Sequence, residues 1–456
     1  MAIISPFQAW RYDPERVPVQ HAVTQPYDKI TPAMQEGYYQ ASPYNLVRII
    51  LGKRQPEDGD AENVYTRAAA SFQNWRQTGV LRRDAEPSIY RYSQTFKVPG
   101  SVSEAMAGNT IRAERRGFIA LGRIEEYSAG VVFRHEQTLA KPKADRLDLL
   151  RATRAHFGQL FMLYSGAGQV DELLNAAAAP SVVPDIEVTD EYEVAHRVWK
   201  ISDASVIASV QERMRDRKLI IADGHHRYET ALTYRNERRD GDRCADAGAA
   251  TNANTDGLAP YDSVMMTFVD MDCQGLVILP THRLVFGLPS LSAQQFQAEA
   301  RKFFVVEEVD AAKDVDAPRV TAILRQAGQA GAALLAVTAG RTFLLHSPKA
   351  IGSSLFGDLS LRQQALDVVQ LHKCLLEGVL KISEEAIRNQ DNVSYCREAG
   401  EALAQVRSGK AQMAFLMNPA RMEQVRDIAF AGEVLPQKST DFFPKLLSGL
   451  TIYALE

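Results

Sequence analysis

The sequence predicts a protein of the α/β to α+β class, in which a mixed sheet forms the core of a first domain and a second α+β domain follows. The chain has 456 residues and is 46% hydrophobic, which is enough for two or three domains with packed cores. Patterns of helical and strand period follow one another, and a short apolar strand at 218–222 leads through a polar turn into a helix at 227–238. The predicted domains cover 1–290 and 291–456.

Local patterns predict the elements of the first domain. Val64, Ala68, Phe72 and Trp75 recur at helical spacing, and Gly79 stands where a helix would end, which predicts a helix within 61–79. The alternation Ile-Tyr-Arg-Tyr-Ser-Gln-Thr-Phe-Lys-Val predicts a strand. The expected strands are 21–24, 89–98, 116–127, 158–164, 193–201, 218–222, 263–269 and 275–279, and the other expected helices are 145–157 and 227–238.

Helical and strand patterns alternate in the second domain. They cover 292–304, 319–327, 332–338, 341–345 and 359–380, and a strand at 412–417 is followed by a helix at 420–428. The stretch 238–257 is rich in Asp, Asn, Ala and Gly and has almost no large apolar side chain. Loops of this length are uncommon without a function, so we interpret it as a lid.

Composition excludes several classes of protein. With 52 Lys+Arg against 56 Asp+Glu, the net charge of −4 argues against a dedicated nucleic-acid binder, and we expect no nucleic-acid partner. No apolar run of about eighteen residues and no secretory signal are visible, so we expect no membrane partner and a cytoplasmic location. The cysteines form no CxxC pair, which favours reduced thiols over a disulfide scaffold or a structural zinc site: Cys244, Cys273, Cys374 and Cys396.

The densest polar cluster of the sequence follows the apolar strand at 218–222. Asp223 ends the strand, Gly224 permits a tight turn, and a helix begins near His226. The first N–H groups of a helix have no partners within it and carry the positive end of the dipole. Together with His225, His226 and Arg227 they predict an anion site, with phosphate as the best candidate. The alternative is a capped helix start with a surface histidine pair.

Asp223 has two interpretations. It could cap the helix, or it could hold a divalent metal ion that bridges phosphate oxygens.

Three further segments carry similar polar chemistry, and we expect them to complete the pocket. Two of them follow apolar strands, the region where ligands collect in α/β proteins. Taken singly, each is more often a surface pair. The residues are His135, Glu136, His282, Arg283 and Lys438.

Near the N-terminus, Pro26 fixes the backbone ahead of Tyr27 and Asp28. Asp28 could act as a general base or metal ligand, or it could close an Asx-type turn onto the N–H of Ile30. The sequence contains no HExxH helix, Walker A loop, GxGxxG loop or GxSxG elbow, so the commonest nucleotide and hydrolase signatures are excluded.

Several of these motifs, in order, resemble the family catalogued as domain of unknown function (DUF) 1015. They are Pro-Tyr-Asp at 26–28, Pro-Tyr-Asn-Leu-Val-Arg at 43–48, His-Glu-x-Thr at 135–138, Ala-Asp-Gly-His-His-Arg-Tyr-Glu-Thr-Ala at 222–231, Pro-Thr-His-Arg at 280–283 and Gln-Lys-Ser-Thr-x-Phe-x-Pro-Lys at 437–445. The resemblance covers nearly the whole chain.

More distantly, the Asp-Gly-His-His-Arg turn resembles the phosphate-binding turn of the ParB/sulfiredoxin superfamily, which includes free-serine kinases. This resemblance implies a ParB/sulfiredoxin-like nucleotide-binding core in the first domain. Asp223, His225, His226 and Arg227 match its phosphate-binding turn. Asp28 is the candidate for the acidic residue that acts on the substrate hydroxyl, where the kinase relatives carry Glu.

These observations together predict Mg²⁺-dependent phosphoryl transfer from ATP or ADP to a small hydroxyl compound, with free serine as a candidate. Arg227, His226 and the helix N-terminus would hold phosphates, Asp223 the metal or the acceptor, and Asp28 would deprotonate the acceptor. The predicted catalytic residues are thus Asp28, Asp223 and His226. Two alternatives stay open: a nucleotide-sensing protein without turnover, and a metal-dependent hydrolase that uses His135, His225, His226 and Asp223. The oligomeric state is left open.

Overall fold

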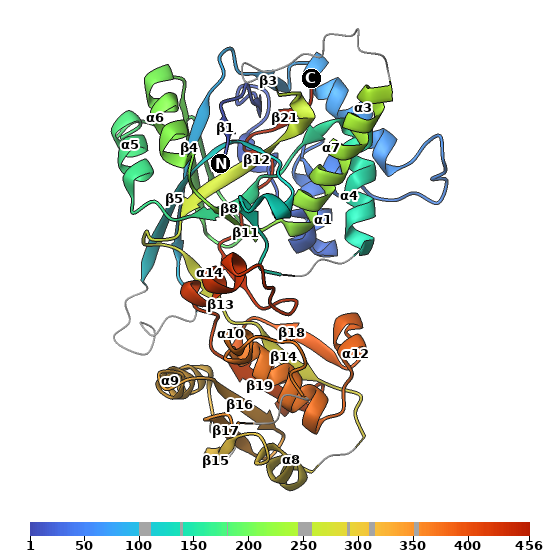
Figure 1. The fold of residues 1–456 in the computed structure, drawn as a ribbon. Coiled ribbons are helices and arrows are strands. Elements are labelled where there is room, and N and C mark those ends of the chain that lie inside the picture. The colour runs from blue at the N-terminus through green and yellow to red at the C-terminus, as the bar shows by residue number, and fades with distance from the viewer. Residues whose placement is uncertain are drawn as a thin grey trace.

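A computed structural model describes residues 1–99, 111–136, 140–179, 181–244, 258–289, 292–309, 315–350 and 355–456. Within these ranges, nine strands form a larger sheet and six form a smaller one. Figure 1 shows the larger sheet in the upper part of the molecule and the smaller sheet in the lower part, with helices around both. The expected mixed α/β class is confirmed. None of the described helices is long and apolar enough to span a bilayer.

The larger sheet is mixed. Its order is β6-β11-β8-β12-β5-β4-β10-β9, and β1 pairs with β5. β12 runs parallel to β8 and β11 runs parallel to β6, while the other pairs are antiparallel. The strands are β1 (Ile4–Ser5), β4 (Ile89–Lys97), β5 (Arg112–Arg123), β6 (Val132–Phe133), β8 (Leu160–Tyr164), β9 (Ile186–Thr189), β10 (Ala195–Ile201), β11 (Leu219–Asp223) and β12 (Ser263–Asp270).

Helices flank the larger sheet on two sides. In Figure 1, α5 and α6 lie to its left, and α1, α3, α4 and α7 lie to its right. β12 is buried along its whole length, as expected for a strand with neighbours on both edges and helices nearby. The helices are α1 (Pro32–Ala41), α2 (Val47–Ile50), α3 (Val64–Gln77), α4 (Ala140–Thr153), α5 (Gln169–Ala177), α6 (Ala204–Met214) and α7 (His225–Cys244).

The smaller sheet is antiparallel throughout, in the order β15-β17-β16-β19-β14-β18. Its strands are β14 (His282–Val285), β15 (Val305–Val309), β16 (Ala333–Thr338), β17 (Thr342–His346), β18 (Val393–Cys396) and β19 (Met413–Met417). Its helices are α8 (Ala293–Ala300), α9 (Ala317–Gly328), α10 (Leu361–Gln364), α11 (Asp367–Gln370), η6 (Leu371–Val379), α12 (Glu384–Asn389), α13 (Ala399–Arg407) and α14 (Met422–Phe430). The predicted division between residues 290 and 291 stays a prediction, and β14 precedes it.

After the smaller sheet, the chain returns to the upper part of the molecule (Figure 1). We call residues 434–454 the C-terminal segment. Its strand β20 (Asp441–Phe443) pairs with β13 (Val277–Leu279), and β21 (Tyr453–Ala454) pairs with β7 (Ala155–His156). Single bridges also join Leu435 to Glu136 and Ser448 to Thr24. A further pair, β2 (Trp10–Tyr12) and β3 (Leu81–Arg83), lies at the N-terminal end. The return of the chain places the C-terminal segment beside the segments that contain Thr24 and Glu136.

Most elements agree with the sequence patterns, and α3 and β4 match their predicted ranges closely. The strand predicted at 21–24 is wrong: Val19–His21 forms a short 3₁₀ helix, η1, after Pro18, and Thr24 makes only a single bridge. The helix predicted at 145–157 ends at Thr153, because Arg154 adopts φ 47° and leaves the helical region.

Two other predicted segments differ from the structure. The segment 359–380 is divided into α10, α11 and η6, since Leu366 has an extended ψ of 135° between α10 and α11. α7 continues to Cys244, so it takes up the first part of the predicted lid. The rest of that lid, 245–257, lies outside the described residues.

Candidate functional site

The turn between β11 and α7 is built around Gly224. Its φ of 96° favours glycine, and the N–H of Tyr228 donates to its carbonyl at 2.9 Å. A Cβ atom there would lie 2.9 Å from Leu160 and 3.0 Å from a guanidinium nitrogen of Arg227. Glycine therefore permits both the turn and the close approach of Arg227.

Arg227 is held on two sides. One guanidinium nitrogen donates to the backbone carbonyl of Gln159 at 2.5 Å, and the other donates to Asp223 Oδ2 at 3.0 Å. The side chain is 19% exposed. The guanidinium is thus fixed in orientation beside the first turn of α7.

Asp223 also binds a lysine from the C-terminal segment. Lys445 Nζ lies 3.1 Å from Asp223 Oδ1 and 3.1 Å from Asp441 Oδ1. Burial alone would raise the pKa of Asp223, but the charges of Lys445 and Arg227 outweigh it and hold that pKa well below its ordinary value. Burial would lower the pKa of Lys445, and Asp223 and Asp441 raise it instead. The cluster is therefore fully charged at neutral pH.

The predicted Pro-Tyr-Asp motif lies beside this cluster. Tyr27–Lys29 form a short 3₁₀ helix, η2, and Asp28 is exposed. Burial, followed by the nearby charge of Lys445, lowers the pKa of Lys29. The charge of Asp28 also contributes to the raised pKa of Lys445, after those of Asp223 and Asp441. The structure thus brings Asp28 toward the turn, and its catalytic role stays a prediction.

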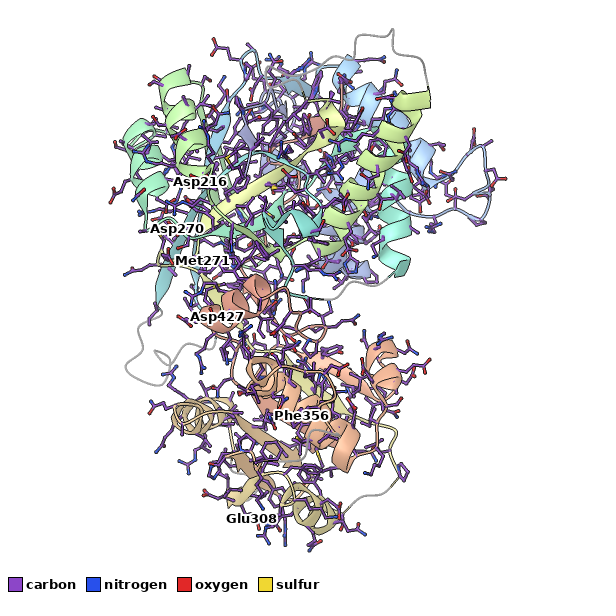
Figure 2. All side chains as sticks on the ribbon, viewed as in Figure 1. Asp216, Asp270, Met271, Glu308, Phe356 and Asp427 are labelled. Atoms are coloured by element: carbon purple, nitrogen blue, oxygen red, sulfur yellow. The ribbon has the colours of Figure 1, made fainter. Side chains whose placement is uncertain are left out.

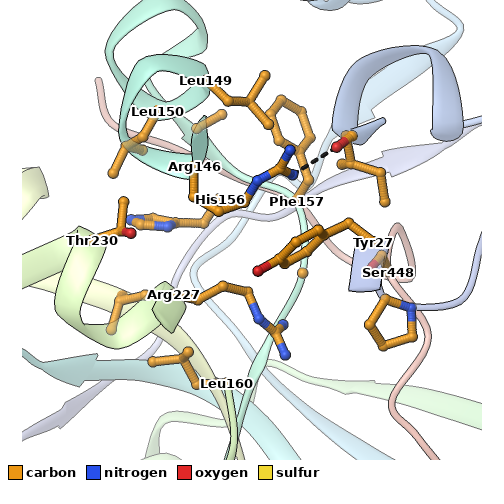
Figure 3. A pocket seen from close by; sticks show the side chains of 15 residues that line it. Tyr27, Arg146, Leu149, Leu150, His156, Phe157, Leu160, Arg227, Thr230 and Ser448 are labelled. Carbon is orange, nitrogen blue, oxygen red and sulfur yellow. Dashed lines mark hydrogen bonds between the residues drawn. The ribbon is translucent and has the colours of Figure 1, made fainter. Parts of the chain in front are cut away.

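A small pocket of about 70 Å³ opens beside Arg227. Figure 3 shows Arg227 from α7, Tyr27 from η2 and Arg146 from α4 around it, with Leu149, Leu150 and Leu160 on its walls. Arg146 lies over the ring of Tyr27, 4.1 Å from its centre, and donates to the carbonyl of Ile50 at 2.6 Å. This pocket has room for a few water molecules, not for a whole nucleotide.

Several buried polar atoms around the turn have no hydrogen-bond partner among the described residues. They are both side-chain amide atoms of Gln159, the Nε2 atom of His225 and the hydroxyl of Thr230. Gln159 is 1% exposed and precedes Leu160, which contacts Gly224 as described above. Buried polar groups in proteins nearly always have a partner, and exceptions point to bound water or a ligand. Such atoms thus lie on Gln159 before β8 and on two residues of the first turns of α7.

His135 and Glu136 connect the turn to the C-terminal segment. His135 Nδ1 contacts the carbonyl of Ile221 at 2.8 Å, and its Nε2 contacts Thr440 Oγ1 at 2.7 Å. Its ring meets that of His225 edge to face at 4.8 Å. Burial lowers the pKa of His135 to about 4, so it is neutral at pH 7.

Glu136 accepts hydrogen bonds from the N–H groups of Lys438 and Ser439. Burial raises the pKa of its carboxyl, and the charge of Lys438 opposes that shift. Lys438 itself is exposed and adopts φ 59°. The binding roles predicted for His135, Glu136 and Lys438 stay predictions.

The other predicted residues lie on β14 of the smaller sheet and at the start of α7. Arg283 is fully buried on β14 and reaches the carbonyls of Gln437 and Lys438 at 3.4 and 3.2 Å. His282 instead accepts from the N–H of Met417 at 3.3 Å within the smaller sheet. His226 is half-buried at the start of α7, and burial lowers its pKa. The structure thus links Arg283 to the segment that carries Lys438, while His282 bonds elsewhere.

A metal role for Asp223 does not fit the residues as they stand. Lys445 and Arg227 each contact one of its oxygens, so a metal ion bound there would lie close to two positive charges. Within the ranges that the structure covers, no group of three or more His, Cys, Asp or Glu side chains could hold a metal ion. No observation therefore favours the hydrolase alternative, and the metal role stays a prediction.

Sequence reasoning missed Lys445, Asp441, Lys29 and Gln159 as site residues. Lys445 was visible only as the last residue of the Gln-Lys-Ser-Thr motif, 222 positions from Asp223. Gln159 was detectable in principle, because it is a single amide between apolar side chains in Phe-Gly-Gln-Leu-Phe. The sequence does not indicate which residues Lys445 and Gln159 contact in the folded protein.

The chain belongs to the DUF1015 family of proteins of unknown function, whose family model matches residues 4–369. The resemblance carried by the motifs is thereby confirmed. A search of curated proteins gave no match.

Several solved structures resemble this chain at low sequence identity. A free serine kinase in complex with AMP has a TM-score of 0.33 and 12% identity, covering 68% of this chain and 83% of that one. A conserved hypothetical protein from Pyrococcus furiosus has a TM-score of 0.33 and 11% identity, covering 70% and 90%. SbnI from Staphylococcus aureus, truncated at its C-terminus, has a TM-score of 0.31 and 10% identity, covering 72% and 85%.

Proposed function

We propose that the β11–α7 turn binds the phosphate groups of a nucleotide and that the protein transfers a phosphoryl group to a small hydroxyl compound. The observation that carries the proposal is the group of buried polar atoms around the turn that lack a hydrogen-bond partner among the described residues, on Gln159, His225 and Thr230. A ligand with several oxygen atoms would supply those partners.

Charge and backbone favour an anion at this turn. The N-terminus of α7 carries the positive end of a long helix dipole. Arg227 is already oriented by Gln159 and Asp223, so little side-chain freedom is lost when it binds. Gly224 lets the guanidinium of Arg227 lie close to the backbone of the turn. Lys29 and Lys438 add positive charge to the same region.

Asp28 is our candidate base for the transfer. The acceptor hydroxyl would pass its proton to the Asp28 carboxylate while its oxygen forms a bond to the transferred phosphorus. The bond from phosphorus to the departing phosphate oxygen breaks in the same step. Phosphoryl transfer depends mainly on positioning and charge neutralisation, which Arg227 and the helix N-terminus would supply. Free serine is the first acceptor to test.

A thermal-shift experiment tests the binding step. ATP, ADP, CTP and GTP are each added with and without Mg²⁺, and a ligand at about one hundred times its Kd stabilises the protein by about 2.7 kcal/mol. Arg227→Lys keeps the charge but loses the two-sided contact, so the shift should fall. Arg238→Ala, an exposed position on the same helix, is the matched control and should retain the shift. Absence of a shift with every nucleotide would rule out the proposal.

Asp28→Asn separates transfer from binding. The variant should keep the nucleotide shift, since Asp28 is exposed and does not hold the turn. It should lose formation of phosphoserine, or of the phosphate ester of another small hydroxyl compound, measured by mass spectrometry. A wild-type protein that binds nucleotide but phosphorylates none of these acceptors would instead support the sensor alternative.

A further inference from the structure

A second and larger cavity lies in the lower part of the molecule. Its volume is about 460 Å³, within the range of small-molecule sites, and it lies between η6, α12, β18 and the first residues of the C-terminal segment. Phe356, labelled in Figure 2 among the lower helices, forms part of its wall. None of the residues predicted as site residues lines it.

η6 shapes one side of this cavity. Leu371–Val379 form a π-helix of nine residues. π-Helical turns are rare and occur frequently at functional sites. This helix places His372, Lys373 and Glu377 on the lining of the cavity.

Among the described residues of the lining, His372 has a buried ring nitrogen without a hydrogen-bond partner. It is 8% exposed, and its Nε2 atom has no hydrogen-bond partner among the residues that the structure describes. Burial, aided by the charges of Arg283 and Lys373, holds the pKa of His372 well below its ordinary value. A neutral imidazole offers either one N–H or one lone pair at that atom. Either suits a single hydrogen bond to a ligand.

Four of the five charged groups of the lining pair with one another, and Asp358 is the fifth. Lys373 lies 2.9 Å from Glu377 and 3.4 Å from Glu384, and Arg388 lies 3.2 Å from Glu384. The rest of the wall is largely apolar, with Phe356, Leu359, Val369 and Ile387. An uncharged ligand would leave these pairs intact and would pack against the apolar part of the wall.

We propose that this cavity binds an uncharged heteroaromatic small molecule, whose ring packs against Phe356 and Leu359 and whose polar edge hydrogen-bonds His372 Nε2. The walls provide the apolar contact area that aromatic rings need, and the imidazole provides the single polar contact that orients them. This site goes beyond the proposed phosphoryl transfer and does not depend on it, because the two sites share no lining residue.

The test follows the histidine ring nitrogens by NMR in the full-length protein labelled with ¹⁵N-histidine. Indole, quinoline, adenine and nicotinamide are the probes, each titrated to millimolar concentration. At least one should shift the His372 signals saturably. His372→Phe keeps the ring and removes the nitrogen, and should weaken that probe about tenfold, the effect expected from loss of one hydrogen bond. His346→Phe, on β17 away from the cavity, is the matched control and should leave binding unchanged.

Leu359→Trp provides a second variant in case His372→Phe fails to fold. The larger side chain would fill part of the cavity and should abolish binding while His372 is intact. The proposal is overturned if no probe moves the His372 signals. It is also overturned if a probe moves only those of His135 or His225, since that would locate binding at the β11–α7 turn. Both outcomes leave the nucleotide experiment on Arg227 to be judged separately.

Discussion

Two lysines in this protein each lie between two carboxylates, and they differ in burial and in the length of chain that they connect. Lys445 joins Asp223 to Asp441, with side-chain exposures of 10%, 23% and 11%. Lys373 joins Glu377 to Glu384, with exposures of 21%, 24% and 63%. Removing a buried charge leaves its partners unpaired at large cost, while exposed pairs contribute little. The same local arrangement therefore joins distant parts of the chain by a buried ion pair at Lys445, and forms a more exposed ion pair between near neighbours at Lys373.

Lys445→Met should give the largest loss of stability, up to about 3 kcal/mol, because Asp223 and Asp441 would lose their most buried cation and keep only Arg227 and Arg397, which are 19% and 31% exposed. The methionine side chain fills most of the space of the lysine stem. The measurement is the free energy of unfolding in urea. Lys53→Met removes one side of an exposed pair with Glu36 and should change stability by less than about 0.5 kcal/mol. A loss of less than about 1 kcal/mol for Lys445→Met would show that the two regions do not differ.

Stability should also fall as the pH drops from 6.5 toward 4. Burial lowers the folded-state pKa of His135 and of His282 to about 4, against an ordinary value of 6.5. Both are neutral in the folded state where the unfolded chain already binds a proton. Their contribution is complete above pH 6.5 and is lost as the pH falls toward 4. Each of the two histidines lowers the unfolding free energy by up to about 1.4 kcal/mol for each pH unit in this range.

Unfolding free energies between pH 5 and 7 check this expectation in each region separately. His135→Gln and His282→Gln should each lower the number of protons taken up on unfolding by about one, and so reduce the slope of unfolding free energy against pH. A variant with an unchanged slope would mean that its histidine is protonated in the folded protein.

Gln159→Leu should act in the opposite direction. Both amide atoms of Gln159 lack a partner among the described residues, so an apolar side chain of similar size should stabilise the ligand-free protein by about 1 kcal/mol. The same variant should reduce the thermal shift with nucleotide. Thermal melts with and without ADP measure both effects.

Gln94→Leu is the matched control for that substitution. Gln94 accepts from Arg115 at 3.0 Å and donates to the carbonyl of Lys445 at 2.8 Å. Its loss leaves Arg115 buried without this acceptor, so the variant should be less stable. If Gln159→Leu were equally destabilising, the amide of Gln159 would have a partner in the folded protein.

The sequence predicted what depends on neighbouring residues. α3 and β4 follow from local periodicity, and the β11–α7 turn follows from a contiguous string that ends a strand, turns at Gly224 and begins a helix. The part of the site that closes over this turn could not be predicted in the same way. Lys445 and Thr440 meet Asp223 and His135 only because the C-terminal segment returns after the smaller sheet. No local pattern encodes that path.

The second cavity gave no signal in the sequence for a different physical reason. His372 and Lys373 lie in a stretch with helical spacing, which predicts an ordinary helix over 359–380. The structure instead winds Leu371–Val379 as a π-helix, with His372 on the lining of the cavity. The binding site that we propose there rests on a cavity and on a buried unsatisfied atom, both of which arise only when the chain folds.

Lys373→Met should have the smallest effect, less than about 1 kcal/mol of unfolding free energy, because solvent reaches Glu384 and can hydrate the carboxylates that lose their cation. The experiment is urea unfolding beside Lys445→Met at low and at high salt. Salt should weaken the contribution of Lys373 and leave that of Lys445 nearly unchanged, since buried pairs are poorly screened. If Lys373→Met lowered the unfolding free energy as much as Lys445→Met, the ion pairs on the wall of the second cavity would contribute as much as the buried pairs of Lys445.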